Sequence, residues 1–429
     1  MPNLARIFRI LCLGFTLTQG FSTSAQQSSS PIVLHAARLL NVATGNVLTP
    51  GEVLVVGERI QAVGTHVERP AGAKVIDLGD RTLMPGLIDA HIHLFLHPGA
   101  EDLQTVEENV PWRTLIAADA ARADLFAGFT AERDMGTEGA GSADTAVRNA
   151  IDRGLFPGPR LRVSGNAIDI LGGHEDAVKY NPAQHVLPNA DYANSAAELI
   201  AVMREQRKQG SDFAKIYETG KDTVAKGEIH SAYQYTEAEL TAAVTEARRL
   251  GTIVSVHAQD DPGALYAARA GVASIDHASQ IGEETMHLMK EKGIYAIPTF
   301  VVMEFFAKHA ATPEAAAKEK ALIDIKIAEF KRQVAYGVPF AVGSDVGPFP
   351  HGTQAHEMTL MARYGMKPLA VLQADLLNGA KLLGWASEIG QLKPGFYADI
   401  VAVPGNPLDD ISAVERVSFV MKSGRVVRR

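Results

Sequence analysis

The feature that most restricts the fold is a regular alternation of strand and helix patterns between residues 85 and 389. Thr236 and Glu239 form a capping box before one helix pattern, and Thr312 precedes a helix-starting proline in another. Eight such alternations over about 300 residues predict an α/β fold of the (β/α)8 TIM-barrel class. The eight apolar strand candidates begin near Gly86, Gly128, Arg160, Asp212, Gly251, Ala273, Gly293 and Gly337.

An open, doubly wound sheet is the alternative arrangement of alternating strands and helices. That fold would place a Gly-x-Gly-x-x-Gly turn directly after the first strand. The first strand candidate reads MPGLIDAHIH over residues 84–93 and contains no such turn. The sequence therefore favours the barrel.

The two ends of the chain are expected to form one small β-sandwich. Short β-branched runs separated by glycines fill residues 26–84, and similar runs fill residues 390–429. Neither end has enough strands to bury a sheet face alone, so we expect the two ends to pair. The barrel, residues 85–389, would then be inserted between them.

Residues 1–25 have the pattern of a secretory signal peptide. Arg6 and Arg9 precede a short apolar run, and small residues lead up to Ala25. The run is too short to span a bilayer, and a buried N-terminal helix is the alternative. We expect an exported protein, periplasmic or secreted, which loses its single cysteine, Cys12, with the leader.

Composition excludes several classes of protein. The chain is 46% hydrophobic and 21% charged, which is unlike a disordered chain. A net charge of −8 without a basic block argues against nucleic acid and anionic membranes as partners. One cysteine can form neither an internal disulfide nor a cysteine-based zinc site.

Residues able to bind a metal ion stand at the ends of five of the eight predicted strands. Each one alone has an ordinary structural explanation, such as a core histidine or a helix-capping aspartate. Together they would meet at the carboxyl face of the barrel, where barrel enzymes keep their active sites. The sequence therefore predicts a metal site built from His91, His93, Lys215, His257, His277 and Asp345.

These residues, with segments 84–93 and 390–401, resemble the metal-dependent amidohydrolase superfamily, and the resemblance covers the chain from about residue 31 onward. It implies a hydrolase with two divalent ions, of which zinc is the expected metal and manganese, cobalt or iron would also fit. His91, His93 and Asp345 would bind one ion, and His257 and His277 the other. Lys215, carbamylated by carbon dioxide, would bridge them.

The chemistry of this centre explains why these residue types are needed. An ammonium cannot bind a cation, whereas a carbamate offers two anionic oxygens, and apolar neighbours of Lys215 should lower its pKa and free the amine. A hydroxide bridging the two ions would attack the scissile carbonyl. Asp345 would act first as general base and then as general acid toward the leaving nitrogen.

Three further residues are candidates for binding the substrate. Tyr217 shares a strand face with Lys215, His174 lies in a Gly-rich loop after the third strand, and His351 follows the eighth strand. Tyr217 and His174 resemble positions that bind the substrate carbonyl or terminal carboxylate in the branch of the superfamily with Xaa-Pro-type dipeptidases, carboxypeptidase-like enzymes and ochratoxinases. Segments 169–176, 215–222 and 343–354 resemble bacterial ochratoxin-hydrolysing amidohydrolases, which implies cleavage of ochratoxin A into an isocoumarin acid and phenylalanine.

Other functions remain open at this point. An Xaa-Pro-type dipeptidase or carboxypeptidase would use the same chemistry on a small dipeptide-like substrate. A ring deaminase would use one metal and lack the bridging lysine, and an inactive scaffold would have lost ligands. The resemblance also implies a homo-oligomer, an octamer.

Overall fold

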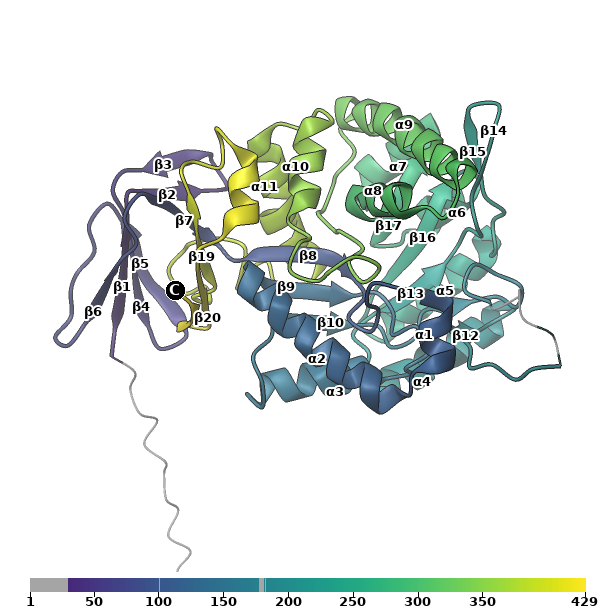
Figure 1. Ribbon diagram of the computed structural model, residues 1–429, viewed down its shortest axis with the longest axis horizontal. Coiled ribbons are helices and arrows are strands. Elements are labelled where there is room, and N and C mark those ends of the chain that lie inside the picture. Colours follow the sequence, from purple (N-terminus) through teal and green to yellow (C-terminus); the bar gives the residue numbers. More distant parts are fainter. Residues whose placement is uncertain (1–29, 100, 177–180, 182) are drawn as a thin grey trace, which may run out of the picture.

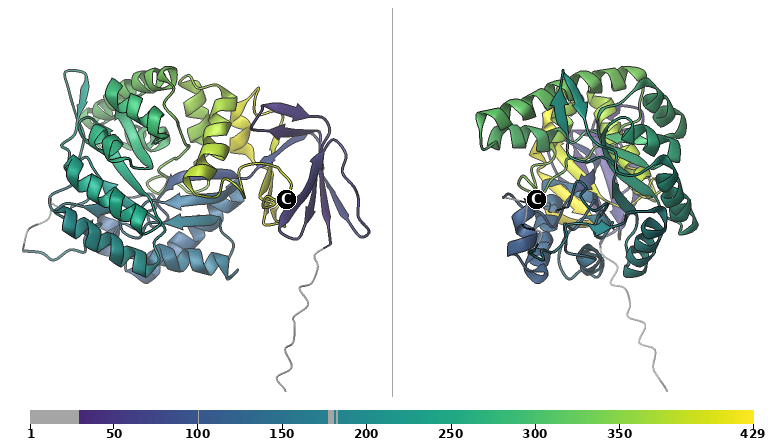
Figure 2. Two further views of the ribbon diagram at one scale, coloured as in Figure 1. Left: turned by 180° about the vertical axis from the view of Figure 1, so that it is seen from behind. Right: turned by 90° about the vertical axis from the view of Figure 1, so that its right-hand side faces the viewer.

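A computed structural model describes residues 30–99, 101–176, 181 and 183–429. The expected leader, residues 1–25, lies outside the described residues. The molecule has a larger part, in which helices surround parallel strands, and a smaller part made mostly of strands (Figure 1). Figure 2 shows the same two parts from behind and from the side.

The strands of the larger part pair in parallel and largely follow one another in chain order. They form the sheets β10-β9-β8 and β12-β11-β13-β16-β17-β18. Seven of the eight predicted strands begin within three residues of their expected positions. The strands are β8 (Leu87–Ile92), β9 (Phe129–Asp134), β10 (Arg160–Val163), β11 (Ile168–Asp169), β12 (Asp191–Tyr192), β13 (Ala214–Tyr217), β16 (Val254–Asp260), β17 (Ser274–Gln280) and β18 (Tyr295–Ile297).

The eighth expected strand is an extended segment, residues 339–346, that lies between β18 and β8. On one side, Ala296 donates its backbone N–H to Pro339 and accepts one from Ala341. On the other side, the Asp345 N–H donates to the carbonyl of His91 at 2.8 Å. The segment therefore carries Asp345 to the end of β8.

Helices follow most of these strands along the chain. The predicted capping box of α5 is present, since Thr236 and Glu239 each bond the other's backbone N–H. Thr312 caps α9, with Pro313 in its first turn, as expected. The helices are α1 (Glu101–Glu107), α2 (Val110–Ala127), α3 (Ala143–Asp152), α4 (Ala196–Gln209), α5 (Glu237–Arg249), α6 (Gly263–Ala270), α7 (Glu283–Lys292), α8 (Phe300–His309), α9 (Pro313–Tyr336), α10 (His356–Arg363), α11 (Pro368–Gln373) and α12 (Gly379–Leu382). A hairpin, β14 (Thr223–Ala225) and β15 (Glu228–His230), leads into α5.

The smaller part joins the two ends of the described chain. Its sheets have the orders β5-β4-β1-β6 and β21-β20-β19-β7-β2-β3. In the second sheet β7 pairs antiparallel with β19, from Arg81 opposite Pro404 to Pro85 opposite Ile400. Apolar side chains from both sheets share one buried cluster. The strands are β1 (Ile32–Ala36), β2 (Arg38–Asn41), β3 (Asn46–Leu48), β4 (Gly51–Val56), β5 (Arg59–Gly64), β6 (Lys74–Asp77), β7 (Arg81–Pro85), β19 (Ile400–Pro404), β20 (Phe419–Lys422) and β21 (Arg425–Arg428).

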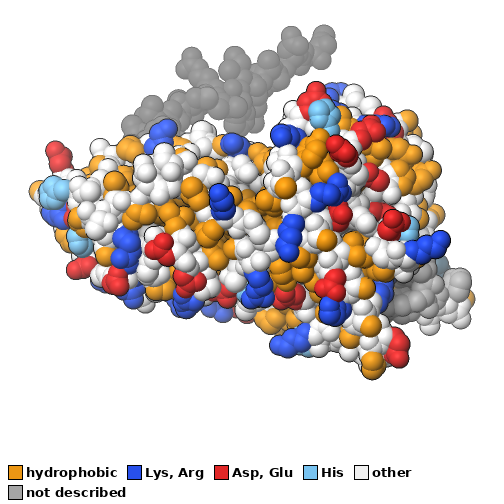
Figure 3. All heavy atoms as spheres, turned by 90° about the horizontal axis from the view of Figure 1, so that it is seen from above, with side chains coloured by type: hydrophobic (Ala, Val, Ile, Leu, Met, Phe, Trp, Pro, Cys, Tyr) orange, Lys and Arg blue, Asp and Glu red, His pale blue; other side chains and the backbone are white. Residues whose placement is uncertain are grey.

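Two surface properties bear on possible partners. None of the helices in the described ranges is long and apolar enough to cross a membrane. On the face seen in Figure 3, basic and acidic side chains are interspersed with apolar ones.

Candidate active site

A cavity of about 290 Å³ opens among the carboxyl-terminal ends of the parallel strands. Eight of the nine residues predicted for the site line it, including all six predicted metal ligands. Side chains separated by up to 254 positions in the sequence therefore meet in one place. These residues are His91, His93, His174, Lys215, Tyr217, His257, His277 and Asp345.

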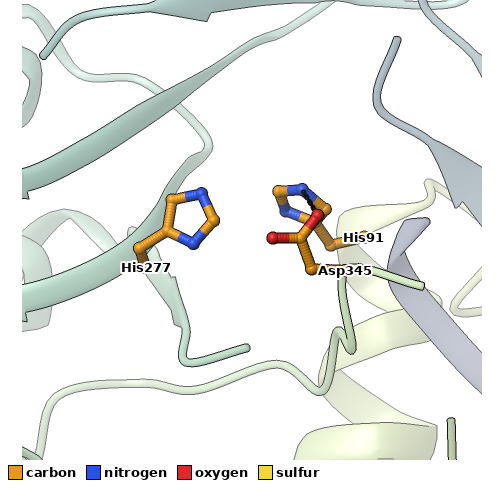
Figure 4. Close-up of side chains that lie close together, drawn as sticks. All are labelled: His91, His277 and Asp345. Carbon is orange, nitrogen blue, oxygen red and sulfur yellow. Dashed lines mark ion pairs between the residues drawn. The ribbon is translucent and has the colours of Figure 1, made fainter. Parts of the chain in front are cut away.

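Asp345 lies between the two histidines of β8. Its Oδ1 atom is 3.3 Å from Nε2 of His91 and 3.3 Å from Nε2 of His93. Figure 4 shows His277 on the side opposite His91 and Asp345. Ligand atoms of His91, His277 and Asp345 lie within 4.8 Å of one another.

The remaining two histidines of the predicted centre lie side by side on β16 and β17. The imidazole rings of His257 and His277 have their centroids 4.3 Å apart. Nδ1 of His277 is 2.8 Å from the hydroxyl of Thr299, which leaves Nε2 as the free ligand atom. Nε2 of His257 is buried and has no hydrogen-bond partner within the described part of the chain.

Burial and neighbouring charges set the ionisation of these groups. Burial lowers the pKa of both His257 and His277 well below its usual value, and the nearby Lys215 lowers it further, so both rings are neutral at pH 7. Burial opposes ionisation of Asp345, but His91 and His93 hold its pKa well below the usual range. Neutral imidazoles and an ionised carboxylate are the forms that bind cations. Burial opposes the charged form of His93, but Asp345 and Glu138 raise its pKa well above the usual value, so this ring must lose a proton when it binds a cation.

This donor set fits a divalent cation. A buried imidazole nitrogen without a partner, at His257, is costly unless something binds it. The imidazole and carboxylate donors that converge here suit zinc and related metals. The residues present are therefore chemically suited to the predicted metal centre.

The expectation that Lys215 has only apolar neighbours was wrong, because a buried carboxylate lies beside it. The buried Lys215 ammonium lies 3.1 Å from Oδ2 of Asp276. In a regular strand the neighbouring residues Asp276 and His277 would face opposite sides of the sheet. The backbone of β17 is irregular here, because His277 and Ala278 have positive φ angles of 74° and 43°. This kink in β17 allows both Asp276 and His277 to reach the interior.

Tyr217 and His174 lie together on one side of the cavity. Their rings stack at 4.9 Å, and the His174 ring is 4.3 Å from that of His257. Burial, reinforced by Lys221, lowers the pKa of His174 to about 4, so its ring is neutral at pH 7. Burial also raises the pKa of Tyr217 well above its usual value, so the phenol keeps its proton.

His351 does not reach the cavity, contrary to its prediction as a substrate contact. It is absent from the described residues that line the cavity, and its Nδ1 lies 2.7 Å from Oδ2 of Asp124 on α2. The loop after the eighth strand turns back over α2, and Asp124 also accepts the backbone N–H of Gly352. This anchoring of the loop explains the difference.

Several cavity residues were missed by the sequence reasoning. Oε1 of Glu138, in the loop after β9, lies 3.2 Å from Nδ1 of His93. One wall comes from α8 and α9, and the helical spacing of their apolar residues was the only available signal. The residues of this wall are Val302, Met303, Phe306 and Leu322.

Comparison with known proteins defines the class of the molecule. The model of the Amidohydrolase family matches residues 82–427, so the chain belongs to that family. It is a hydrolytic enzyme.

Two curated relatives match most of the chain. Ochratoxinase of Aspergillus niger is 29% identical over 94% of this chain and 88% of its own length. Imidazolonepropionase of Shouchella clausii is 26% identical over 89% of this chain and 86% of its own length.

Solved structures agree with this assignment. A Xaa-Pro dipeptidase with methionine bound in its active site superposes with a TM-score of 0.84 at 29% identity, covering 93% of this chain and all of that one. The A. niger ochratoxinase structure gives 0.80 at 26% identity, covering 93% of this chain and 96% of its own.

Proposed function

We propose that this enzyme hydrolyses the amide bond between an acyl group and an α-amino acid, and that ochratoxin A is a substrate, cleaved to ochratoxin α and L-phenylalanine. The observation that carries the proposal is the convergence of four histidines, Lys215 and Asp345 in one cavity with an apolar wall. The similarity to ochratoxinase over 94% of the chain supports the choice of substrate.

We assign two divalent ions, zinc by preference, to the six predicted ligands. His91, His93 and Asp345 would hold one ion, His257 and His277 the other, and carbamylated Lys215 would bridge them. When bound, such ions polarise a carbonyl group and lower the pKa of water to near neutrality.

Asp345 is assigned the proton transfer. Its Oδ1 atom faces His91 and His93 at 3.3 Å, so Oδ2 is the oxygen assigned to the reacting groups. Because the carboxyl group is ionised at neutral pH, Oδ2 can take a proton from the attacking water. It then returns that proton to the nitrogen of the leaving amino acid.

Tyr217 and His174 are assigned to binding the substrate. The phenol of Tyr217 is protonated and can donate a hydrogen bond to the carbonyl oxygen, where negative charge develops. The neutral ring of His174 stacks on Tyr217 and can donate one further hydrogen bond to a carboxylate or carbonyl.

The apolar wall sets the choice between two related substrates. Val302, Met303 and Leu322 are buried, whereas Phe306 is 40% exposed at the rim. Such a surface suits the aromatic groups of ochratoxin A, which lose apolar area to it. An Xaa-Pro dipeptidase activity is the second candidate, favoured by the similarity to the dipeptidase structure.

A hydrolysis screen with detection of free amino acids tests the proposal. Ochratoxin A, an N-acyl-phenylalanine and Xaa-Pro dipeptides would be compared before chelation, after chelation and after zinc is restored. We expect phenylalanine from the first two, loss of activity on chelation and recovery with zinc. His174→Asn should raise KM, with His287→Asn as its control, since His287 is an exposed histidine on α7. If none of the substrates releases an amino acid, the substrate assignment is wrong.

We also propose that the parallel strands close into a (β/α)8 barrel over residues 85–389. The hydrogen bonds of segment 339–346 to both β18 and β8 support closure. Segments 26–84 and 390–429 would together form a β-sandwich, which the apolar cluster shared by the two described sheets supports.

The leader and the assembly are further parts of the proposal. Residues 1–25 would direct export to the periplasm, and mature protein recovered from that fraction should begin at Gln26. Retention of Met1 in recovered protein would contradict this. Light scattering of the mature protein should give the mass of a homo-octamer.

A further inference from the structure

Asp276 lies beside two of the proposed metal ligands, Lys215 and His91, and takes no part in the proposed proton transfer or substrate binding. It precedes His277 on β17 and is completely buried. Its Oδ2 atom lies 3.1 Å from Nζ of Lys215 and 3.4 Å from Nδ1 of His91. That Nδ1 atom makes no hydrogen bond in the described part of the chain, and the Asp276 carboxylate lies close enough to accept one after a small adjustment.

The other oxygen of Asp276 is held from the opposite side. Oδ1 accepts a hydrogen bond from the Ser274 hydroxyl at 2.9 Å and lies 3.5 Å from the guanidinium of Arg133. Arg133 is itself anchored, because it donates to the carbonyl of Ala90 at 2.7 Å and to the hydroxyl of Ser255 at 2.6 Å. Burial lowers the pKa of Arg133 to about 10, so it remains charged at neutral pH.

We propose that Asp276 is a positioning residue that orients Lys215 and His91 for metal binding. This inference rests on the proposed function. Asp276 would accept a hydrogen bond from Nδ1–H of His91. The other ring nitrogen, Nε2, which lies beside Asp345, is then left to bind the metal.

For Lys215 the same oxygen directs the carbamate. Carbamylation joins Nζ to the carbon of carbon dioxide and releases two protons from the ammonium, which leaves one N–H on the nitrogen. Asp276 accepts that remaining N–H, so the two carbamate oxygens face away from it and into the cavity.

The contacts require a carboxylate at position 276. Both oxygens of Asp276 face hydrogen-bond donors, Lys215 and His91 on one side and Arg133 and Ser274 on the other. An asparagine has one acceptor oxygen, so its NH2 group must face one of these donor pairs. Arg133 is charged at neutral pH, so we expect the amide oxygen to turn toward it and the NH2 group toward Lys215.

The test compares Asp276→Asn with Asp144→Asn in the full-length protein. Asp144 is also fully buried and accepts backbone N–H groups of Thr145 and Gly165, but it does not line the cavity. Zinc affinity, the carbamate signal after loading with ¹³C-labelled bicarbonate, and kcat and KM would be measured for both. In Asp276→Asn we expect about 10- to 100-fold weaker zinc binding and loss of the ¹³C signal. Asp144→Asn should keep both.

The outcomes separate this inference from the proposed function. If the wild type holds zinc and carbamate and Asp276→Asn matches it, the role of Asp276 is overturned while the function stands. If the wild type shows neither, the proposed function is overturned, and the role of Asp276 with it.

A milder variant covers the case in which Asp276→Asn does not fold. Ser274→Ala removes one of the two donors to Oδ1 without leaving a buried charge unpaired. We expect zinc binding to weaken about three- to tenfold, the equivalent of one hydrogen bond. Unchanged zinc affinity in Ser274→Ala would overturn the role of Asp276.

Discussion

Thr299 forms a hydrogen bond with His277 whose contribution to the free energy of unfolding can be measured in metal-free protein. Its hydroxyl lies 2.8 Å from Nδ1 of His277, and the residue is completely buried just before α8. Its backbone has a φ of 53°, a conformation that β-branched residues rarely adopt. The hydrogen bond and the backbone strain can be separated by three substitutions.

Thr299→Val keeps the shape and the strained backbone but removes the hydroxyl. It leaves Nδ1 of His277 buried without a partner, which should lower the free energy of unfolding by about 1–3 kcal/mol. Thr299→Ser keeps the hydroxyl and loses one methyl group, which costs about 0.8 kcal/mol. Thr299→Gly loses the bond, the methyl group and Cβ but regains roughly 1–2 kcal/mol of strain, so its stability should lie close to that of Thr299→Val.

Equilibrium urea unfolding of metal-free protein, followed by circular dichroism, measures these differences. Chelator must be present throughout, because a bound metal would stabilise the folded state by mass action. Thr299→Ser is expected to be more stable than both Thr299→Val and Thr299→Gly. If Thr299→Val is as stable as Thr299→Ser, the hydrogen bond does not contribute as argued.

Three further substitutions test other parts of the molecule. Asp345→Asn should leave zinc largely bound but abolish turnover; near wild-type kcat would remove its role in proton transfer. Hydrogen bonds from Arg69 lower the pKa of Glu52 to about 2 against 4.5 when unfolded, so its stabilisation is present above pH 4.5 and lost as pH falls toward 2. Glu52→Gln should therefore lower the free energy of unfolding by on the order of 1 kcal/mol at pH 7. Urea titrations should show the difference between wild type and variant shrinking as the pH falls toward 2, and a constant difference would contradict this. Gly424 has a φ of 71°, and a side chain there would overlap the carbonyl of Gly57. Gly424→Ala should therefore lower the free energy of unfolding by about 1–3 kcal/mol, which thermal unfolding would detect as a lower midpoint. An unchanged midpoint would contradict this.

The parts of the molecule that follow local rules could be predicted from the sequence. Apolar β-branched runs bounded by glycine placed seven strands within three residues of their observed starts. Parallel strands end on one face, so residues as distant in sequence as His91 and Asp345 could be assigned to one cavity.

The parts that depend on irregular backbone could not be predicted. The positive φ angles of His277 and Ala278 let His277 reach the cavity as well as Asp276, whereas regular alternation would place only one of these two neighbours there. His351 was misplaced because the path of its loop depends on Asp124, which lies more than 200 residues earlier. The apolar wall depends on how α8 and α9 pack, which residue spacing alone does not determine.

The pairing of β7 with β19 has a consequence for the order in which the chain is made. β7 ends at Pro85 and the strand beside it begins at Ile400, 315 residues later. At roughly 5–20 residues per second, β7 leaves the ribosome about 15–60 s before its partner. For that time one edge of β7 has no neighbour, and an open edge can pair with the same strand of another nascent chain. The sheet that joins the two ends is therefore completed last, and a chain cut short before residue 400 would keep its edge open.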